Sequence, residues 1–192
     1  MSSKKEILNS IKGQIKIKYD MPALNFNGIT YSNKLEQFIN ILTIVGGKAI
    51  TLKKDEDINQ CIKLLYPEAK IIASNLPYIS IATLNPDESQ LNAFNNLDLS
   101  IIEGQLGVAE NGSVWIPQNV KEKAAYFAPE SLVIIISKDS IVNNMHEAYN
   151  QISFCDKAFG VFISGPSKTA DIEQALVMGA HGAKSIVVII RA

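Results

Sequence analysis

The sequence predicts an α/β fold in which a mostly parallel sheet carries helices on both faces. Apolar segments of strand length alternate with segments of helical periodicity from residue 33 to residue 192, as in right-handed βαβ units. The segment 131–137 is continuously apolar between its terminal serines, which is typical of a central parallel strand. The dipeptide Asn111-Gly112 between two short apolar segments predicts an antiparallel hairpin inserted into this pattern.

The length and composition set the class of protein. The chain has 192 residues, 47% of them hydrophobic and 19% charged, which suits one domain with a buried core and excludes a disordered chain. The net charge of -1 favours neither nucleic acid nor an anionic membrane as a partner. The longest apolar run, Leu132–Ile136, is far shorter than the roughly 18 residues of a transmembrane helix, and no secretory signal is present. We therefore expect a soluble, cytoplasmic protein.

The N-terminal segment predicts an amphipathic helix followed by a linker. Four isoleucine and leucine side chains recur at helical intervals, which places them on one face. They are Ile7, Leu8, Ile11 and Ile15. Asp20-Met21-Pro22 then interrupts the pattern. We expect residues 1–31 to form this N-terminal helix and linker, and residues 32–192 to form one α/β domain.

The first half of the domain predicts two helix–strand pairs and the start of a third helix. Asn33, with Glu36 three residues later, forms a capping-box-like start, and Gly46-Gly47 ends that helix. Asn85-Pro86-Asp87-Glu88 also predicts a helix start. The expected helices span 33–45, run from residue 55 to Pro67, and begin again at residue 85, and the expected strands span 48–52 and 71–73.

The second half predicts the hairpin and then further alternation of strands and helices. The short strands around the hairpin cover 99–103, 107–110 and 113–117. After the strand 131–137, the pattern predicts a helix at 144–152, a buried strand at 159–164, a helix at 169–178 closed by Gly179, and a final strand at 185–191.

Cysteine and histidine are too few for a metal centre within this chain. The two cysteines, Cys61 and Cys155, are far apart, and an iron–sulfur cluster or a structural cysteine zinc site needs about four ligands. A disulfide scaffold is not expected from two cysteines either. The sequence has two histidines and none of the common nucleotide, nucleophile-elbow or zinc-protease motifs. We expect this chain to bind no metal and no cofactor.

The segment after Ser164 is the strongest candidate for a ligand site. A buried strand ends there, a Gly-Pro loop follows, and hydroxyl residues open the expected helix. The free N–H groups and positive dipole end of such a helix suit an anion bound outside the carboxyl ends of parallel strands. The predicted ligand-binding residues are Gly165, Ser167, Lys168, Thr169 and Asp171. The alternative is structural: Ser167 or Thr169 caps the helix, and Asp171 stabilises its first turn.

Two further side chains are candidates for acid–base chemistry. Glu110 lies on a turn bounded by Gly107 and Gly112, where a carboxylate can act as a nucleophile or general base. His181 precedes Gly182 in a glycine-rich loop before the last strand, where an imidazole can be exposed. The alternatives are a solvated hairpin tip for Glu110 and a helix-capping loop for His181.

Three motifs in the second half resemble those of a known family. The segment Ser164–Glu173, which reads SGPSKTADIE, the segment Gly179–Gly182 and the segment Gly107–Val114 are similar to signatures of the lactate-utilisation protein C or LUD domain family. The resemblance covers about residues 35–192, and Ala183 stands where the family usually has proline. It implies a fold like that of the NagB/RpiA/CoA-transferase superfamily.

The resemblance also implies a function. The family acts in a three-part system that oxidises L-lactate to pyruvate, and the other two components carry iron–sulfur clusters. By this resemblance the chain is a subunit of a lactate-oxidising complex, with iron–sulfur proteins as partners and a small carboxylate or phosphate as ligand. Glu110 and His181 are then the catalytic candidates. Supporting roles fall to Gly107, Gly112, Glu173 and Gly182.

Two other functions stay open on the residues alone. One is a stand-alone acyl-transfer or sugar-phosphate enzyme with Glu110 as nucleophile or base, and the other is an interaction module that binds no ligand. Turnover by the isolated protein favours the enzyme, and a ligand-dependent rise in melting temperature argues against the interaction module. In each case we expect Glu110 and the segment Gly165–Thr169 to lie close together, because both follow strand ends.

Overall fold

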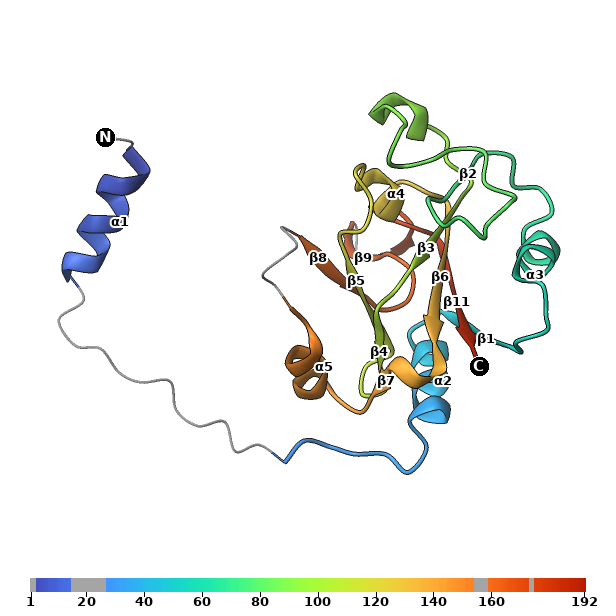
Figure 1. Ribbon diagram of the computed structural model, residues 1–192, viewed down its shortest axis with the longest axis horizontal. Helices are drawn as coiled ribbons and strands as arrows, with labels where there is room; N and C mark the ends of the chain where they lie inside the picture. Colours follow the sequence, from blue (N-terminus) through green and yellow to red (C-terminus); the bar gives the residue numbers. More distant parts are fainter. Residues whose placement is uncertain (1–2, 15–26, 154–158, 173–174) are drawn as a thin grey trace.

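The central sheet has five strands, all parallel. The computed structural model describes residues 3–14, 27–153, 159–172 and 175–192. In spatial order the strands are β1 (Lys48–Leu52), β11 (Ser185–Arg191), β6 (Ser131–Ser137), β3 (Leu99–Glu103) and β2 (Ile72–Ala73). Each strand is parallel to its neighbours, and β6 lies in the middle (Figure 1). This confirms the predicted α/β class and the central position of the apolar segment 131–137.

A second sheet of four strands follows the carboxyl ends of the first. Its order is β7 (Ile141–Val142), β4 (Leu106–Val108), β5 (Ser113–Pro117) and β8 (Gly160–Ile163). The chain passes from β3 into β4, and from β6 through the 3₁₀ turn η2 (Lys138–Ser140) into β7. β4 and β5 form the predicted antiparallel hairpin, and β8 pairs with β5 in the antiparallel sense. The predicted strand 159–164 is therefore present, but it is a half-buried edge of this sheet and not a buried parallel strand.

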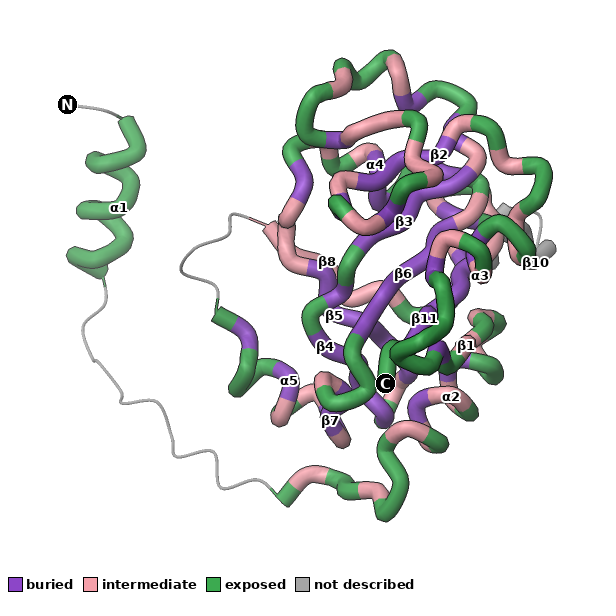
Figure 2. Tube along the Cα trace, turned by 45° about the vertical axis from the view of Figure 1, so that its right-hand side comes forward, coloured by how far each residue is buried: buried purple, intermediate pink, exposed green. Residues whose placement is uncertain are grey.

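Helices cover both faces of the central sheet. Successive side chains of β6 point to opposite faces, so alternate residues of this strand pack against different helices. The helices are α2 (Lys34–Ile44), α3 (Ile58–Leu65), α4 (Ala124–Phe127) and α5 (Met145–Gln151). Ile134 and Ile136 pack in one core cluster with side chains of α2 and α4, whereas Val133 and Ile135 pack in a second cluster with α3. A third, smaller cluster joins α5 to the second sheet. The buried residues in Figure 2 follow these same strands.

Side-chain caps begin the longer helices near the positions that the sequence predicts. Asn33 Oδ1 accepts from Glu36 N at 3.2 Å, which caps α2, and Asn33 Nδ2 donates to the Glu36 carboxylate at 3.1 Å, so the two side chains also bond to each other. α3 begins after Asp57, whose side chain is the N-cap, two residues later than expected. α5 begins after Asn144, which caps it in the same way.

Residue 85 does not begin a helix, which corrects one prediction. Asn85 Oδ1 accepts from Asp87 N at 3.0 Å in a turn, and the next regular element is the 3₁₀ helix η1 (Leu91–Phe94). The Asp87 carboxylate accepts hydrogen bonds from Lys121 N at 2.9 Å and from Asn75 Nδ2 at 3.0 Å. These contacts join residues far apart in the chain and hold the segment as a turn.

The hairpin turn between β4 and β5 also differs from the predicted type. Val108 pairs with Ser113, so the four residues 109–112 connect the strands instead of the two of a type I′ turn. A type I′ turn needs positive φ at both central residues, and of the Asn111-Gly112 pair only Gly112 has it, at +65°. Gly112 N donates to Val108 O at 2.9 Å, and Asn111 Oδ1 accepts from Ser113 N at 3.1 Å.

The predicted helix at 169–178 is wrong, because this segment is a β-hairpin. β9 (Lys168–Ile172) pairs with β10 (Ala175–Met178) in the antiparallel sense, with Thr169 opposite Val177. Both of these residues are β-branched, which favours strands over helices. The apolar spacing in this segment fits a helix, but pairing across the hairpin decides the structure.

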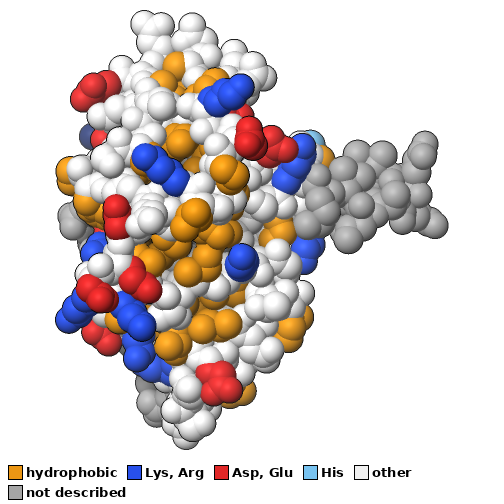
Figure 3. All heavy atoms as spheres, turned by 90° about the vertical axis from the view of Figure 1, so that its right-hand side faces the viewer, with side chains coloured by type: hydrophobic (Ala, Val, Ile, Leu, Met, Phe, Trp, Pro, Cys, Tyr) orange, Lys and Arg blue, Asp and Glu red, His pale blue; other side chains and the backbone are white. Residues whose placement is uncertain are grey.

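The predicted N-terminal helix is present as α1 (Ser3–Gln14), which lies apart from the rest of the chain in Figure 1. None of its residues is buried. On the body of the protein, hydrophobic side chains gather on the side that carries α3 and β1 (Figure 3). Among the helices that the structure describes, none is both long and apolar enough to cross a membrane.

Candidate functional site

The loop after Ser164 packs against the C-terminal end of α2. Ser164 Oγ donates to Asn111 O at 2.8 Å, and Lys168 Nζ donates to Val45 O at 2.5 Å. Gly165, with φ +66°, lies so close to this helix end that a Cβ atom on it would be 2.6 Å from Val45 O. The helix terminus beside the loop is therefore a carbonyl-rich, negative end, which attracts a lysine ammonium and not an anion.

The anion site after Ser164 was expected because a helix N-terminus was predicted there, and the structure has a strand at this position. Neither Ser167 nor Thr169 opens a helix, so neither is an N-cap and no helix dipole is directed at a ligand there. Lys168 is engaged with α2. The side chains of Thr169 and Asp171, and the whole of Glu173, lie outside the described part of the chain, so their roles stay predictions.

The two C-terminal motifs pack against each other. Gly179 N donates to Ser167 O at 2.9 Å, and Ser167 N donates to Ala183 O at 3.0 Å. Gly182 approaches Ser167 so closely that a Cβ atom on the glycine would be 3.2 Å from Ser167 Cβ. The loop 179–183 therefore surrounds Ser167, and predicted site residues from both motifs are in contact.

Glu110 is engaged with a different neighbour. Its Oε2 accepts a hydrogen bond from Met145 N, at the first residue of α5, at 3.0 Å, and its N donates to Asn143 O at 2.9 Å. Asn111, the next residue, accepts from Ser164, so the hairpin turn and the loop after Ser164 do meet through their backbones. The Glu110 carboxylate itself satisfies the N-terminus of α5.

A cleft of about 510 Å³ opens beside His181. Residues 96–98 and 127–130 form two of its walls, and the loop 179–182 with Lys184 forms the third. His181 is exposed in this loop. The volume falls within the range of about 300–1,000 Å³ that is common for small-molecule sites. We therefore take this cleft as the candidate ligand site.

The cleft lies at the amino-terminal edge of the central sheet. Asp98, Glu130 and Lys184 line it, and they immediately precede β3, β6 and β11. A site at the carboxyl ends of the strands was expected, and this cleft lies at the opposite edge of the sheet. Glu110 follows β4 in the second sheet and is not among the residues that line the cleft. Glu110 and His181 therefore do not share this site.

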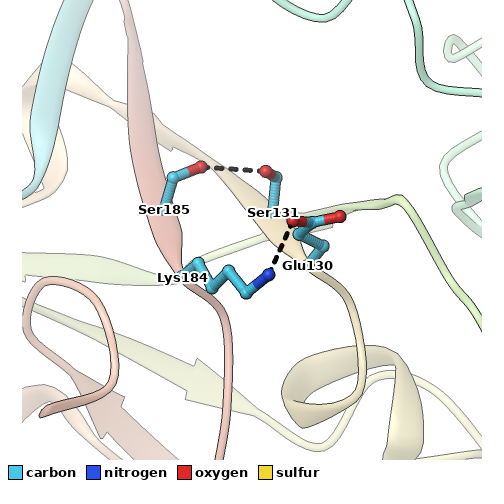
Figure 4. A network of polar contacts seen from close by, with 4 residues as sticks. All are labelled: Glu130, Ser131, Lys184 and Ser185. Atoms are coloured by element: carbon cyan, nitrogen blue, oxygen red, sulfur yellow. Dashed lines mark hydrogen bonds and ion pairs between the residues drawn. The ribbon is translucent and has the colours of Figure 1, made fainter. Parts of the chain in front are cut away.

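An ion pair joins two walls of the cleft. Lys184 Nζ lies 2.9 Å from Glu130 Oε1 (Figure 4). In the backbone, Lys184 N donates to Glu130 O at 2.8 Å. The next residues, Ser131 and Ser185, join their hydroxyls at 2.9 Å. The Lys184 and Glu130 side chains are 61% and 59% exposed, so solvent screens the pair and it contributes about 1 kcal/mol or less. A ligand carboxylate can therefore replace Glu130 on the lysine at little loss of stability.

Asp98 is held in the cleft wall by backbone donors. Its Oδ2 accepts from Lys70 N and from Ile71 N, each at 2.8 Å. The hydrogen bond from Ile71, followed by that from Lys70, lowers the pKa of the Asp98 carboxyl below its usual value. Because two backbone donors already hold Oδ2, we assign Asp98 to the structure of the wall and not to ligand binding.

Replacing Asp98 with asparagine should remove part of the pH dependence of stability. Because the folded-state pKa lies below the unfolded one, the carboxylate stabilises the fold above the unfolded pKa, and this contribution is lost as pH falls through the folded pKa. Urea unfolding at pH 7 and pH 3 should therefore show a larger loss of unfolding free energy for the wild type than for Asp98→Asn. Equal losses in the two proteins would contradict this role.

Glu130 and Lys184 are cleft residues that the sequence reasoning missed. Both are ordinary charged residues, a type that is usually exposed and carries no motif. The only local signal is that each directly precedes a long apolar segment, 131–137 or 185–191. That these two segments become neighbouring strands, which brings the two charges together, follows only from the pairing of β6 with β11.

The described ranges contain no group of three or more His, Cys, Asp or Glu residues placed to hold a metal ion. Cys61 is a half-buried free thiol there, and Cys155 lies outside these ranges. That the chain binds no cofactor stays a prediction.

The fold and the cleft together define a class: an α/β protein whose parallel central sheet leads into a smaller mixed sheet, with a ligand-sized cleft at the amino-terminal edge. The family model of the LUD domain matches residues 35–190, and the chain belongs to this family. This confirms the resemblance noted in the sequence. The link to the NagB/RpiA/CoA-transferase superfamily stays a prediction.

Several relatives are named as lactate utilisation proteins. Lactate utilization protein C of Geobacillus kaustophilus (strain HTA426) is 31% identical over 99 residues, covering 48% of this chain and 41% of that protein. Lactate utilization protein C 1 of Bacillus mycoides (strain KBAB4) is 33% identical over 106 residues, covering 52% and 45%. The protein of that name from Anoxybacillus flavithermus (strain DSM 21510 / WK1) is 26% identical over 182 residues, covering 94% and 78%. The chain thus spans less than half the length of the first two relatives.

A solved structure has the same fold. The crystal structure of a DUF162 family protein from Deinococcus radiodurans matches with a TM-score of 0.66 at 12% identity, covering 86% of this chain and 100% of that one. At this level of identity the match shows the fold alone. It confirms the mostly parallel α/β architecture.

Proposed function

We propose that this protein is a component of an L-lactate oxidation system and acts with iron–sulfur partner proteins. Its membership of the LUD domain family and the names of its relatives support this proposal. The observation that carries it is the contact between Ser167 and Gly182, because this contact joins the two C-terminal motifs, and Gly182 lines the cleft together with His181.

In this proposal the cleft binds a small carboxylate such as lactate. The Lys184 ammonium leaves Glu130 and pairs with the ligand carboxylate, and the exchange sacrifices only about 1 kcal/mol because the existing pair is exposed. His181, on the same wall of the cleft, exchanges a proton with the ligand hydroxyl. Phosphate presents similar anionic chemistry and serves as a second probe.

The electrons of the reaction leave through the partners. Oxidation of lactate to pyruvate releases two electrons and two protons, one from the hydroxyl and one from Cα. A chain with two cysteines does not supply the roughly four thiolates of an iron–sulfur cluster that would accept the electrons. We therefore assign the clusters to the partner proteins and no cofactor to this chain. Under this assignment the isolated chain binds lactate but does not oxidise it.

Growth on L-lactate tests the proposal in cells. A lactate-utilising bacterium that lacks its own copy of this protein should grow on L-lactate when the wild-type chain is supplied and should not grow with His181→Ala. His146→Ala replaces the other histidine of the sequence, on α5, and should support normal growth. Normal growth with His181→Ala would exclude the cleft as the functional site. Normal growth without the protein would exclude the lactate role.

Thermal unfolding of the purified protein tests ligand binding. At about 100 times its dissociation constant, a ligand adds about 2.7 kcal/mol, which raises the melting temperature of a chain of this size by roughly 5–10 °C. We expect this shift with L-lactate or phosphate, and we expect Lys184→Met to abolish it. No shift with either ligand would favour the interaction module, and turnover of an acyl or sugar-phosphate substrate would favour the stand-alone enzyme.

A further inference from the structure

The helix α1 has an apolar face with no neighbour among the described residues. Ile7, Leu8 and Ile11 are 58%, 46% and 55% exposed. Their spacing puts them on one side of the helix, and Lys5 and Lys12, seven residues apart, lie along the flank of that side. An isolated helix of this length is marginal in water, so its stability depends on an apolar surface that the face can cover.

A groove of about 630 Å³ between β1 and α3 offers such a surface. Its apolar lining comes from Ile50 and Leu52 of β1 and from Cys61, Leu64 and Leu65 of α3. Leu64 is 77% exposed, and this groove lies on the side of the molecule shown in Figure 3. β1 is also an edge strand of the central sheet, and covering an exposed edge with a helix is a common protection against association with other strands.

The charges of the groove and of the helix are opposite. Three carboxylates line the groove, those of Asp55, Glu56 and Asp57. Among the described residues, no lysine or arginine lines it. Lys53 and Lys54 precede them in the same loop but are not part of the lining. α1 carries three lysines and a single acid: Lys4, Lys5, Lys12 and Glu6. A helix with a lysine flank therefore suits this groove better than a neutral or acidic one.

The connecting segment is long enough to bring α1 to the groove. From residue 14 to residue 27 the chain has thirteen steps, and an extended chain covers about 3.3–3.6 Å per residue, or about 45 Å. A folded unit of about 165 residues has a radius of gyration of about 15 Å and so a diameter of about 40 Å. A tether of this length gives the helix an effective local concentration of about 1 mM, which favours the groove of its own chain over that of another copy.

We propose that α1 folds back and covers the groove between β1 and α3 of its own chain. Its apolar face, formed by Ile7, Leu8 and Ile11, packs on Leu64 and Cys61. The lysine flank of α1 then faces the carboxylates of the groove. In this position the helix shields both the exposed leucine and the edge of β1.

The thiol of Cys61 reports on this docking, because it lines the groove. In a Cys155→Ser background it is the only cysteine, and mass spectrometry follows its alkylation by N-ethylmaleimide. With a local concentration of about 1 mM and a dissociation constant of about 0.1 mM, docking slows alkylation about tenfold. Ile11→Glu should restore the fast rate. Asn9→Glu makes the same residue on the opposite face of α1 and should leave alkylation slow.

Because α1 has no buried residue, neither Ile11→Glu nor Asn9→Glu should disturb the rest of the fold. Equal alkylation rates in the wild type and Ile11→Glu would overturn the proposal. Protection that increases with protein concentration would also overturn it, since the helix would then bind another copy. As a second measurement, Ile11→Cys in the same Cys155→Ser background should form a disulfide with Cys61 within one chain on mild oxidation. A disulfide-linked dimer would contradict docking in the same chain.

Discussion

Replacing Gly165 with alanine is expected to lower the unfolding free energy by about 3 kcal/mol. At φ +66° a residue with a Cβ atom is strained by about 1–2 kcal/mol. The added Cβ would also lie 2.6 Å from Val45 O and 3.0 Å from Val45 Cγ2, and the backbone at the end of α2 can move only by disturbing the helix. Overpacking of this kind adds about 1–3 kcal/mol. Urea unfolding followed by circular dichroism measures the loss.

Gly13→Ala is the matched control for this substitution. A Cβ atom at Gly13 would have nothing within 4 Å, and the residue lies in α1, which has no buried residue. The same glycine-to-alanine change should therefore leave the unfolding midpoint of the domain unaltered. If Gly165→Ala is as stable as Gly13→Ala, the loop after Ser164 does not pack on the end of α2.

Truncating Ile134 to alanine should have a similarly large effect, a loss of about 3–5 kcal/mol. Ile134 is 0% exposed in the central strand β6 and packs in the cluster that joins the sheet to α2 and α4. Removing a buried isoleucine side chain loses its transfer free energy and leaves a cavity. For a chain of this size, the melting temperature should fall by roughly 6–20 °C, taking about 2–4 °C per kcal/mol. Differential scanning calorimetry measures the change.

Two further variants show whether the effect comes from burial. Ile134→Val removes one methyl group and should lose about 0.5–1.5 kcal/mol. Ile44→Ala makes the full truncation at a side chain that is 68% exposed, and it should stay within about 0.5 kcal/mol of the wild type. The expected order of stability is Ile44→Ala, then Ile134→Val, then Ile134→Ala. An Ile44→Ala protein as unstable as Ile134→Ala would contradict the described core.

The strands and most of the helices could be predicted because each carries its own local pattern. The segments 131–137 and 185–191 are apolar throughout their interiors, and they are the adjacent strands β6 and β11. Asn33 predicts the start of α2 because its cap is made within four residues. The order of the strands could not be predicted in this way, because it depends on pairings between segments that are far apart in the chain.

The candidate site was harder to predict, and the hairpin of β9 and β10 shows why. The sequence of the segment 168–178 contains good helix formers such as Glu173 and Gln174, and it contains no glycine or asparagine of the kind that usually signals a tight hairpin. The apolar residues of the segment fit a helix as well as they fit paired strands. The helix was therefore the natural prediction, and the anion site that depended on its N-terminus lost its basis with it.

The strand order has a consequence for the synthesis of the protein. In the central sheet β1 pairs with β11 alone, and β1 ends at residue 52 whereas β11 begins at residue 185. At a translation rate of about 5–20 residues per second, roughly 7–27 s pass between the synthesis of β1 and the start of β11, the strand with which β1 pairs. Once β6 has been synthesised, it also lacks one of its two neighbours until β11 follows. The nascent chain therefore holds an incomplete sheet with open edges, and closing it is a single late event that requires nearly the whole chain.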